Sequence, residues 1–594
     1  MPTGALSWRR RSRWSLTAPA SDSVHDVFDT QRVDVVVIGA GIAGLVATLE
    51  LLEQLEPDKR ILLLDRCQPH EVGGLAREAF GGMFMVDTGE QRRSGIKDSV
   101  ELALADWRRV AEFEDGDEWP RRWAEEYVTR ARDEVGGWLK SHGVRFFPVV
   151  NWAERGVYGD GNSVPRFHLT WGCGKALVDE VWGAIERHPS RSRLEVRFAT
   201  RVAALVTDGG AVTGCRLEPE GEGAPGRQNG SAGPDERPLT EIAAEQVVVA
   251  AGGVGGNLEI VRREWPPELG KPPKEILMGS HYYADGAMHE EVQRIGGNVT
   301  HLSRMWNYAD AVRHPYPRRP LHGLKLIPPR SGMVLDPTGR RYGPIPLIPT
   351  FDAYDALKRM CEDERGYYWM ICNWKIARRE LDVSGSQHNP NIREKRLGRF
   401  LLSILLGKPT LVRHFVEHCP DFVTAGSLPE LGERMREVTG DGALDPVLME
   451  SEVNRYDATI ARGKPLFNDD QLRRIEQLRN WRGDRLRTCK FQPIVDDKAM
   501  PLIAIRMTVM ARKSLGGVQT DLSSRVLRPD GEPIPGLYAV GEAAGFGGGG
   551  MHGKRSLEGT FLGGCVFTGR IAARAIATER ARSHPGAERP LSTT

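Results

Sequence analysis

Three glycines and one aspartate have the spacing of a dinucleotide-binding site. Gly39, Gly41 and Gly44 directly follow the apolar, β-branched run 35–38. In such a motif the first glycine makes the strand-to-helix turn, the second lets backbone approach a pyrophosphate, and the third lets the helix pack closely on the sheet. A second apolar run, 61–64, ends in Asp65, which is placed to bind ribose hydroxyls. The sequence therefore predicts an ADP-containing dinucleotide at a helix N-terminus.

Further glycine-rich turns predict the other residues that contact the dinucleotide. Paired glycines after the second strand allow a loop to lie against the cofactor, and the run 246–249 is a second buried strand that leads into glycines. A last strand ends at Gly541 and Glu542, whose carboxylate can accept hydrogen bonds from a polyol, and a helix opening at Gly559 can stabilise negative charge on a reduced ring. Besides Gly39, Gly41, Gly44 and Asp65, the predicted cofactor-binding residues are Ile42, Ala43, Arg66, Gly74, Leu75, Ala76, Gly81, Gly82, Val202, Ala251, Gly252, Gly541, Glu542, Gly559, Thr560 and Phe561.

Arg166 and His168 lie two positions apart before the turn 172–174. In that place they can face a site. A structural or surface role for the histidine is equally compatible with the pattern, so both interpretations stay open.

These motifs need strands and helices to position them, and the pattern predicts an α/β fold. We expect a Rossmann-like nucleotide-binding domain in two parts, 31–303 and 501–580. The region 304–500 lacks the pattern of apolar strands followed directly by glycines, and we expect it to be an inserted α+β substrate or cap domain. Residues 1–30 are predicted to be a disordered basic tail, with an export signal as the less favoured alternative, and 581–594 a flexible tail.

Composition excludes several function classes. Among 594 residues the net charge is +2, which gives no reason to expect a nucleic-acid partner. The eight cysteines form no CxxC pair, so no metal site is predicted, and reduced thiols fit the cytoplasm. No apolar stretch is long enough for a membrane span. The short apolar run 400–406 is expected to be core more often than a membrane-touching patch.

Three segments, VVVIGAGIAGL, VVVAAGGVGGN and PIPGLYAVGEAAG, together resemble the FAD-dependent fumarate reductase and 3-ketosteroid Δ1-dehydrogenase superfamily, and within it the actinobacterial FAD-binding dehydrogenases. The resemblance implies FAD, a Rossmann-like FAD-binding domain and an inserted cap over the isoalloxazine. It also implies hydride transfer between flavin N5 and a carbon of a small-molecule substrate, with a separate electron acceptor or donor. Relatives that bind FAD covalently use a histidine just before a GG pair, and none lies between Val72 and Gly82, so non-covalent FAD is expected.

The resemblance also implies candidate catalytic residues, although the motifs differ. Arg512 and Lys513 stand where fumarate reductases have the histidines of HHTxGG. Their HGxNRLGG motif becomes HGKRSLEG, so that Ser556 replaces the arginine and Arg555 lies one position early, after His552. The tyrosine motif YPGPGG of ketosteroid dehydrogenases is absent from the same place.

The predicted function is desaturation of a carbonyl compound such as a steroid-like ketone. A base removes the α-proton, the β-hydride goes to N5, and Lys513, Arg512 or the helix start near Gly559 holds the oxyanion. The alternative is reduction of an activated C=C bond with Arg555 or His552 as proton donor. A third hypothesis is that the protein binds flavin without catalytic turnover. The candidate catalytic residues are Lys513, Arg512, Arg555, His552 and His168.

Overall fold

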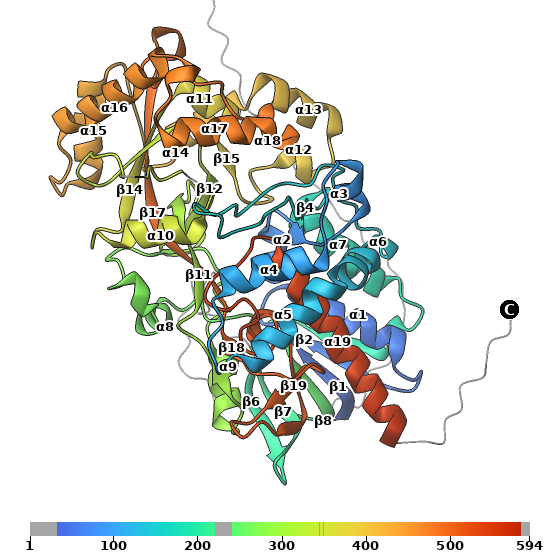
Figure 1. Cartoon of the computed structure of the whole chain (residues 1–594). Coiled ribbons are helices and arrows are strands. Elements are labelled where there is room, and N and C mark those ends of the chain that lie inside the picture. The colour runs from blue at the N-terminus through green and yellow to red at the C-terminus, as the bar shows by residue number, and fades with distance from the viewer. Residues whose placement is uncertain (1–31, 220–239, 344, 349, 584–594) are drawn as a thin grey trace, which may run out of the picture.

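The computed structural model describes residues 32–219, 240–343, 345–348 and 350–583. The tail predicted for 1–30 lies outside these residues, as does most of the tail predicted for 581–594; the last described helix ends at Ser583. Two eight-stranded sheets organise the described chain, each in its own lobe (Figure 1).

The first sheet contains the predicted nucleotide-binding strands. Its order is β19-β20-β8-β1-β2-β5, with β6 and β7 attached beside β8. The pairs β1–β2, β1–β8, β2–β5 and β8–β20 are parallel, so their carboxyl ends meet at one edge. The strands are β1 (Arg32–Ile38), β2 (Ile61–Leu64), β5 (Leu194–Arg197), β6 (Thr200–Asp208), β7 (Ala211–Pro219), β8 (Thr240–Val249), β19 (Arg525–Leu527) and β20 (Pro533–Ala539).

Both faces of this sheet are buried, which explains its continuous apolar runs. Val35 and Val37 point into one core together with α1, and Val36 and Ile38 point into the other. The covering helices are α1 (Ile42–Gln54), α4 (Val100–Ala111), α5 (Glu118–Ala131), α6 (Trp138–Ser141), α7 (Cys173–Glu186), α9 (Ala287–Arg294) and α19 (Thr560–Ser583). Shorter elements nearby are α2 (Gly74–Glu78), α3 (Gly89–Arg93), α8 (Leu258–Arg263), β3 (Gly82–Phe84), β4 (Phe167–Leu169), β10 (Val299–Thr300) and β18 (Gly517–Val518).

The second sheet has the order β13-β14-β17-β11-β12-β15, and β16 and β9 also pair with β17. Its long central strand β17 follows position 500, so this sheet reaches past the boundary predicted at 500/501. The strands are β9 (Leu277–Met278), β11 (Met305–Arg313), β12 (Gly323–Ile327), β13 (Met333–Leu335), β14 (Tyr367–Asn373), β15 (Asp382–Val383), β16 (Phe422–Ala425) and β17 (Leu502–Ser514).

Helices surround the second sheet and complete a separate core, which includes Trp369, Met507 and Val509. They are α10 (Ala353–Cys361), α11 (Trp374–Glu380), α14 (Pro409–His418), α15 (Leu428–Thr439), α16 (Pro446–Ala461), α17 (Asp470–Asn480) and α18 (Arg482–Arg485). The helices α12 (Pro390–Arg393) and α13 (Leu397–Leu406) instead place Ile392 and Phe400 in a small separate cluster with Leu169 and Cys173. The predicted fold class, a discontinuous Rossmann-like domain with an inserted α+β domain, is confirmed.

Candidate functional site

One large cavity runs from the carboxyl ends of the parallel strands to the ends of β11, β12 and β17. Its empty space is about 1750 Å³, part of it open to solvent. Residues of both sheets line it: Gly39, Asp65 and Ala251 belong to the first sheet's edge, and Tyr308, Lys325 and Lys513 come from the second sheet. The carboxyl edge of a parallel sheet is where such folds bind ligands.

The turn between β1 and α1 has the form that a pyrophosphate requires. Gly39 has φ +109°, and a Cβ there would lie 2.5 Å from the carbonyl oxygen of Ala250. A Cβ on Gly44 would lie 1.8 Å from the oxygen of Gly39, so this glycine is needed for close helix packing. A Cβ on Gly41 would meet nothing within 4 Å, and the first turn of α1 has neither a side-chain cap nor an acidic residue. The N–H groups of this helix N-terminus are therefore available to an anion.

Asp65 ends β2 and lines the same cavity. Its Oδ2 accepts a hydrogen bond from the N–H of Ala40 at 2.5 Å, and its Oδ1 accepts one from the N–H of Cys67 at 2.7 Å. These bonds fix the carboxylate beside the glycine turn, with lone pairs left for ribose hydroxyls. Next to it, Arg66 pairs with Asp285 at 2.6 Å. The glycine turn, the open helix end and the fixed carboxylate fit FAD.

Most of the predicted cofactor-binding residues line this cavity: Gly39, Gly41, Ile42, Ala43, Asp65, Arg66, Gly74, Leu75, Ala76, Gly81, Gly82, Val202, Ala251, Gly252, Glu542, Gly559 and Phe561. Gly44, Gly541 and Thr560 are not among the lining residues. Gly541 has φ +64°, and a Cβ there would lie 2.7 Å from that of Ala43, so it acts through packing. The Oγ1 of Thr560 is bonded to the ring of His552 and the hydroxyl of Ser556.

A buried polar cluster lies in the part of the cavity that the second sheet forms. Lys513, near the end of β17, donates from Nζ to the hydroxyl of Tyr308 at 3.1 Å, and Tyr308 donates to Glu558 at 2.6 Å. The ammonium of Lys325 lies 3.7 Å from the same Glu558 oxygen and 3.4 Å from the centre of the Tyr308 ring. Lys513 also lies 3.8 Å from the ring centre of Phe561. Two lysines therefore share one carboxylate and one phenol.

Burial and charge tune the protonation of this cluster. Burial lowers the pKa of Lys513 to about 7; Glu558 opposes that shift, while Arg512 and Lys325 add to it. Burial alone would raise the pKa of Glu558, but Lys325, Lys513 and the hydrogen bonds from Tyr308 and Trp306 outweigh it and lower that pKa to about 2. Burial and the neighbouring Glu558 raise the pKa of Tyr308 well above its usual value, so the phenol stays protonated. Among Lys513, Glu558 and Tyr308, Lys513 is thus the group whose pKa lies close to neutral pH.

Arg512 also lines the cavity, and its Nη1 donates to the carbonyl of Gly279. Glu542 lies nearby, where its Oε1 accepts the N–H of Ser514 at 3.0 Å. Burial raises the pKa of Glu542, although the Ser514 N–H and Lys513 oppose the shift.

Two predicted catalytic residues, His552 and Arg555, lie outside the cavity lining. The His552 ring is buried, stacks on Trp107 and bonds to Thr560 at 2.8 Å. Burial lowers its pKa to about 3, so the ring is neutral, and not an imidazolium acid, at neutral pH. Arg555 turns toward Glu112, with 3.1 Å between Nη2 and Oε1, and its Nε donates to the carbonyl of Val110. The loop places both side chains against α4 rather than against a substrate.

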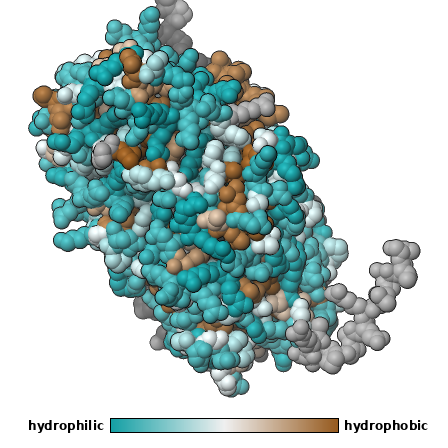
Figure 2. Space-filling view, viewed as in Figure 1, coloured by the Kyte–Doolittle hydropathy of each residue, from teal (hydrophilic) through white to brown (hydrophobic). Residues whose placement is uncertain are grey.

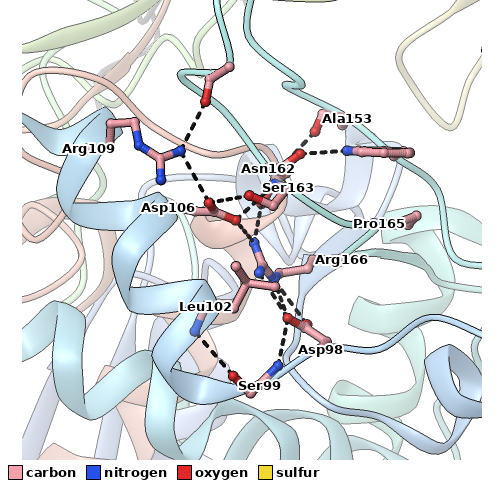
Figure 3. A network of polar contacts seen from close by, with 12 residues as sticks. Asp98, Ser99, Leu102, Asp106, Arg109, Ala153, Asn162, Ser163, Pro165 and Arg166 are labelled. Atoms are coloured by element: carbon pink, nitrogen blue, oxygen red, sulfur yellow. Dashed lines mark hydrogen bonds and ion pairs between the residues drawn. The ribbon is translucent and has the colours of Figure 1, made fainter. Parts of the chain in front are cut away.

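His168 is the third catalytic candidate outside the cavity, and its contacts are those of a structural residue. It is fully buried on β4, with its ring nitrogens 2.8 Å from the Thr88 hydroxyl and 2.8 Å from the Arg166 carbonyl, and burial lowers its pKa to about 4. Figure 3 shows the guanidinium of Arg166 enclosed by Asp98, Asp106 and Asn162, and Arg166 is not among the residues that line the cavity. Both interpretations were open from the sequence, and the structure favours the structural one.

Tyr308, Lys325 and Glu558 are the functional candidates that sequence reasoning missed. Tyr308 and Lys325 lie in the region without recognisable motifs, and only the pairing of β11 with β12 and β17 brings them to the cavity. Glu558 carried a usable signal, because it stands where HGxNRLGG has a glycine. An acidic residue in place of this glycine, beside the cofactor, indicates that the site has a negative charge that proteins with the HGxNRLGG motif lack at this position.

Among the described residues no group of three or more His, Cys, Asp or Glu side chains is arranged to hold a metal ion. None of the described helices combines the length and apolar character needed to cross a bilayer.

Comparison with known proteins agrees with this geometry. The FAD binding domain family matches residues 34–562. A KsdD-like steroid dehydrogenase of Mycobacterium tuberculosis (strain CDC 1551 / Oshkosh) is 44% identical over 559 residues, covering 92% of this chain and 96% of that protein. A KsdD-like steroid dehydrogenase of Mycolicibacterium smegmatis is 42% identical over 542 residues, covering 89% of this chain and 96% of the relative.

A solved 3-ketosteroid Δ1-dehydrogenase from Sterolibacterium denitrificans has the same fold, with a TM-score of 0.66 at 16% identity over 93% of this chain and all of the other. The predictions of FAD, of the superfamily and of a flavin-dependent oxidoreductase are confirmed. The chain belongs to the FAD binding domain family and is an FAD-dependent oxidoreductase.

Proposed function

We propose that this protein dehydrogenates a CH–CH bond next to a carbonyl group in a steroid-like ketone. The observation that carries the proposal is the cluster of Lys513, Tyr308, Glu558 and Lys325 on the wall of the FAD cavity. Its polar groups suit removal of an α-proton. The names of the relatives support a steroid-like substrate, because those curated proteins are called steroid dehydrogenases.

Lys513 is proposed as the base. Its pKa of about 7 is near the operating pH, where a proton-transfer group works best. Tyr308, bonded to Nζ, orients the amine, and Glu558 with Lys325 sets its proton affinity. FAD, when bound, supplies the acceptor for the β-hydride. This assignment replaces the oxyanion-binding role expected of Lys513 from the sequence.

Positive charge for the developing oxyanion is assigned to Lys325 and Arg512, which both line the cavity. A guanidinium keeps its charge at all working pH values, so Arg512 serves as a fixed cation. The cofactor residues proposed are those of the cavity lining. An as yet unidentified electron acceptor must reoxidise FAD, and a cytoplasmic location is proposed because all eight cysteines are free thiols.

Reduction of an activated C=C bond is the less favoured alternative. Its candidate proton donors, His552 and Arg555, lie outside the cavity lining, and His552 is a neutral imidazole rather than an acidic imidazolium near neutral pH.

The test is anaerobic mixing of the FAD-loaded enzyme with a panel of 3-ketosteroids, simple ketones and enoates such as fumarate. A saturated 3-ketosteroid should bleach the flavin, and mass spectrometry should show a product two hydrogens lighter. The proposal fails if no ketone bleaches the flavin while fumarate reoxidises the dithionite-reduced enzyme.

A further inference from the structure

Helix α13 presents an apolar stripe to solvent. None of its residues is buried, and Leu401, Leu402, Leu405 and Leu406 are exposed by 50%, 53%, 65% and 62%. Residues four apart lie on one face of a helix, so these leucines and Leu397 form a continuous stripe. Figure 2, viewed as in Figure 1, shows a brown area over α13 at the upper right. The expectation that 400–406 is core is therefore wrong.

The opposite face of α13 packs against aromatic residues next to the FAD cavity. Phe400 contacts Phe147 and Trp171, with ring centres 5.2 Å and 6.2 Å apart. The same aromatic cluster contains Phe80 and Phe167, which line the cavity. The helix thus packs on the cavity wall.

The segment that leads into α13 also starts at the cavity. Ser384, which lines it, directly follows β15. The hydroxyl of Ser386 donates to the carbonyl of Arg77 at 2.9 Å, and the Asn389 side chain donates to the carbonyls of Val383 and Gly385. These bonds hold the start of the segment to the cavity rim, so α13 has a defined position.

Basic residues lie at the N-terminal end of the leucine stripe. Arg396 and Arg399 are exposed there; Arg396 pairs with Glu394, and Lys395, which is exposed by 43%, pairs with Glu180 at 3.2 Å. In the sequence 390–416 the only acidic residue is Glu394, against Arg393, Lys395, Arg396, Arg399, Lys408 and Arg413. Leucines flanked by basic residues are typical of helices that lie in the interface of an anionic membrane.

We propose that α13 docks this protein on an anionic lipid bilayer. The leucine stripe enters the boundary between headgroups and acyl chains, and the exposed Arg399 binds a headgroup phosphate. Docking in this way brings the cavity wall to the lipid surface, from which an apolar substrate can enter. A helix of ten residues is about 15 Å long, so it lies on the bilayer without crossing it.

A second copy of this chain fits the stripe less well. In a symmetric contact through α13 the helix of the second copy offers the exposed Arg399 no acidic partner, because residues 397–406 contain no Asp or Glu. The membrane neutralises the same cation. Because the docking depends on surface residues alone, it stands or fails independently of the steroid substrate.

The experiment is co-sedimentation of the full-length, FAD-loaded protein with vesicles of phosphatidylcholine plus phosphatidylglycerol, and with vesicles of phosphatidylcholine alone. The wild type should bind the anionic vesicles, and less so as salt rises. Leu401→Gln with Leu405→Gln should lower the partition coefficient about tenfold or more. The matched control is Val447→Gln with Leu466→Gln, which removes equally exposed apolar side chains elsewhere and should bind like the wild type.

Equal binding of the α13 variant and the control would overturn the proposal. So would loss of binding on deletion of residues 1–30 with no effect of the α13 variant. A change of the α13 variant from dimer to monomer in light scattering, without a change in vesicle binding, would assign the stripe to a second copy. Flavin content and far-ultraviolet circular dichroism verify that each variant is folded.

Discussion

Lys513 is the residue on which the proposed chemistry depends most. Lys513→Ala should keep FAD but lose roughly 10²–10⁴-fold in the rate of flavin reduction, the usual range for a general base. Lys513→Arg should not restore the rate, because a guanidinium stays protonated and cannot accept a proton. Stopped-flow absorbance with an accepted ketone measures both, and Lys490→Ala, on an exposed lysine, is the control. If Lys513→Ala reduced its flavin at the wild-type rate, Lys513 would not be the base.

Glu558 provides a prediction about pH. The neutral amine of Lys513 is the active form, so the rate should rise as pH rises through about 7 and then level off. The negative charge of Glu558 raises the pKa of Lys513, and its removal in Glu558→Gln should move the midpoint of the profile to lower pH. Glu532→Gln, on an exposed carboxylate, should leave the profile unchanged. A rate that falls through pH 7 would show that Lys513 acts as a proton donor.

At the scale of elements, Arg166 ties β4 to the start of α4. Its partners Asp98 and Asp106 have fully buried side chains, and pairs of this kind cost about 3–5 kcal/mol when one member is removed. Arg166→Ala should therefore lower the free energy of unfolding by roughly that amount in urea denaturation. Arg109→Ala is the matched control, since Arg109 also reaches Asp106 but is 43% exposed, and it should cost less than about 1 kcal/mol. Equal losses in the two variants would mean that the network in Figure 3 is not what holds this region.

The same elements explain which parts of the fold and the site could be predicted from the sequence. The turn after β1 was predictable because its glycines act through backbone space: Gly39 and Gly44 have no room for a Cβ. Side-chain direction was not predictable. His552 matches a motif position but stacks on Trp107, a contact between residues 445 positions apart that no local pattern contains. Tyr308 needed the pairing of β11 with β17, which joins segments about 200 residues apart.

At the scale of the whole molecule, FAD should be part of the stability of the fold. A ligand that binds only the native state adds about 2.7 kcal/mol at a hundredfold excess over its Kd. Added FAD should raise the melting temperature of the apoprotein, and FMN at the same concentration should raise it less because it lacks the adenosine part. Asp65→Asn should reduce the FAD effect but not the FMN effect. Differential scanning fluorimetry measures all three, and an FMN effect as large as that of FAD would show that the α1 turn and Asp65 are not used.

The division of labour between the two sheets has a practical consequence for redesign. The first sheet provides the glycine turn and Asp65, whereas Tyr308, Lys325 and Lys513 all come from the second sheet. The catalytic side chains can then be exchanged on β11 and β12 while the redox cofactor and its binding turn stay untouched. Because Tyr308 and Lys325 are the residues of those two strands that line the cavity, Tyr308→Phe and Lys325→Met should give proteins that remain yellow but reduce their flavin more slowly.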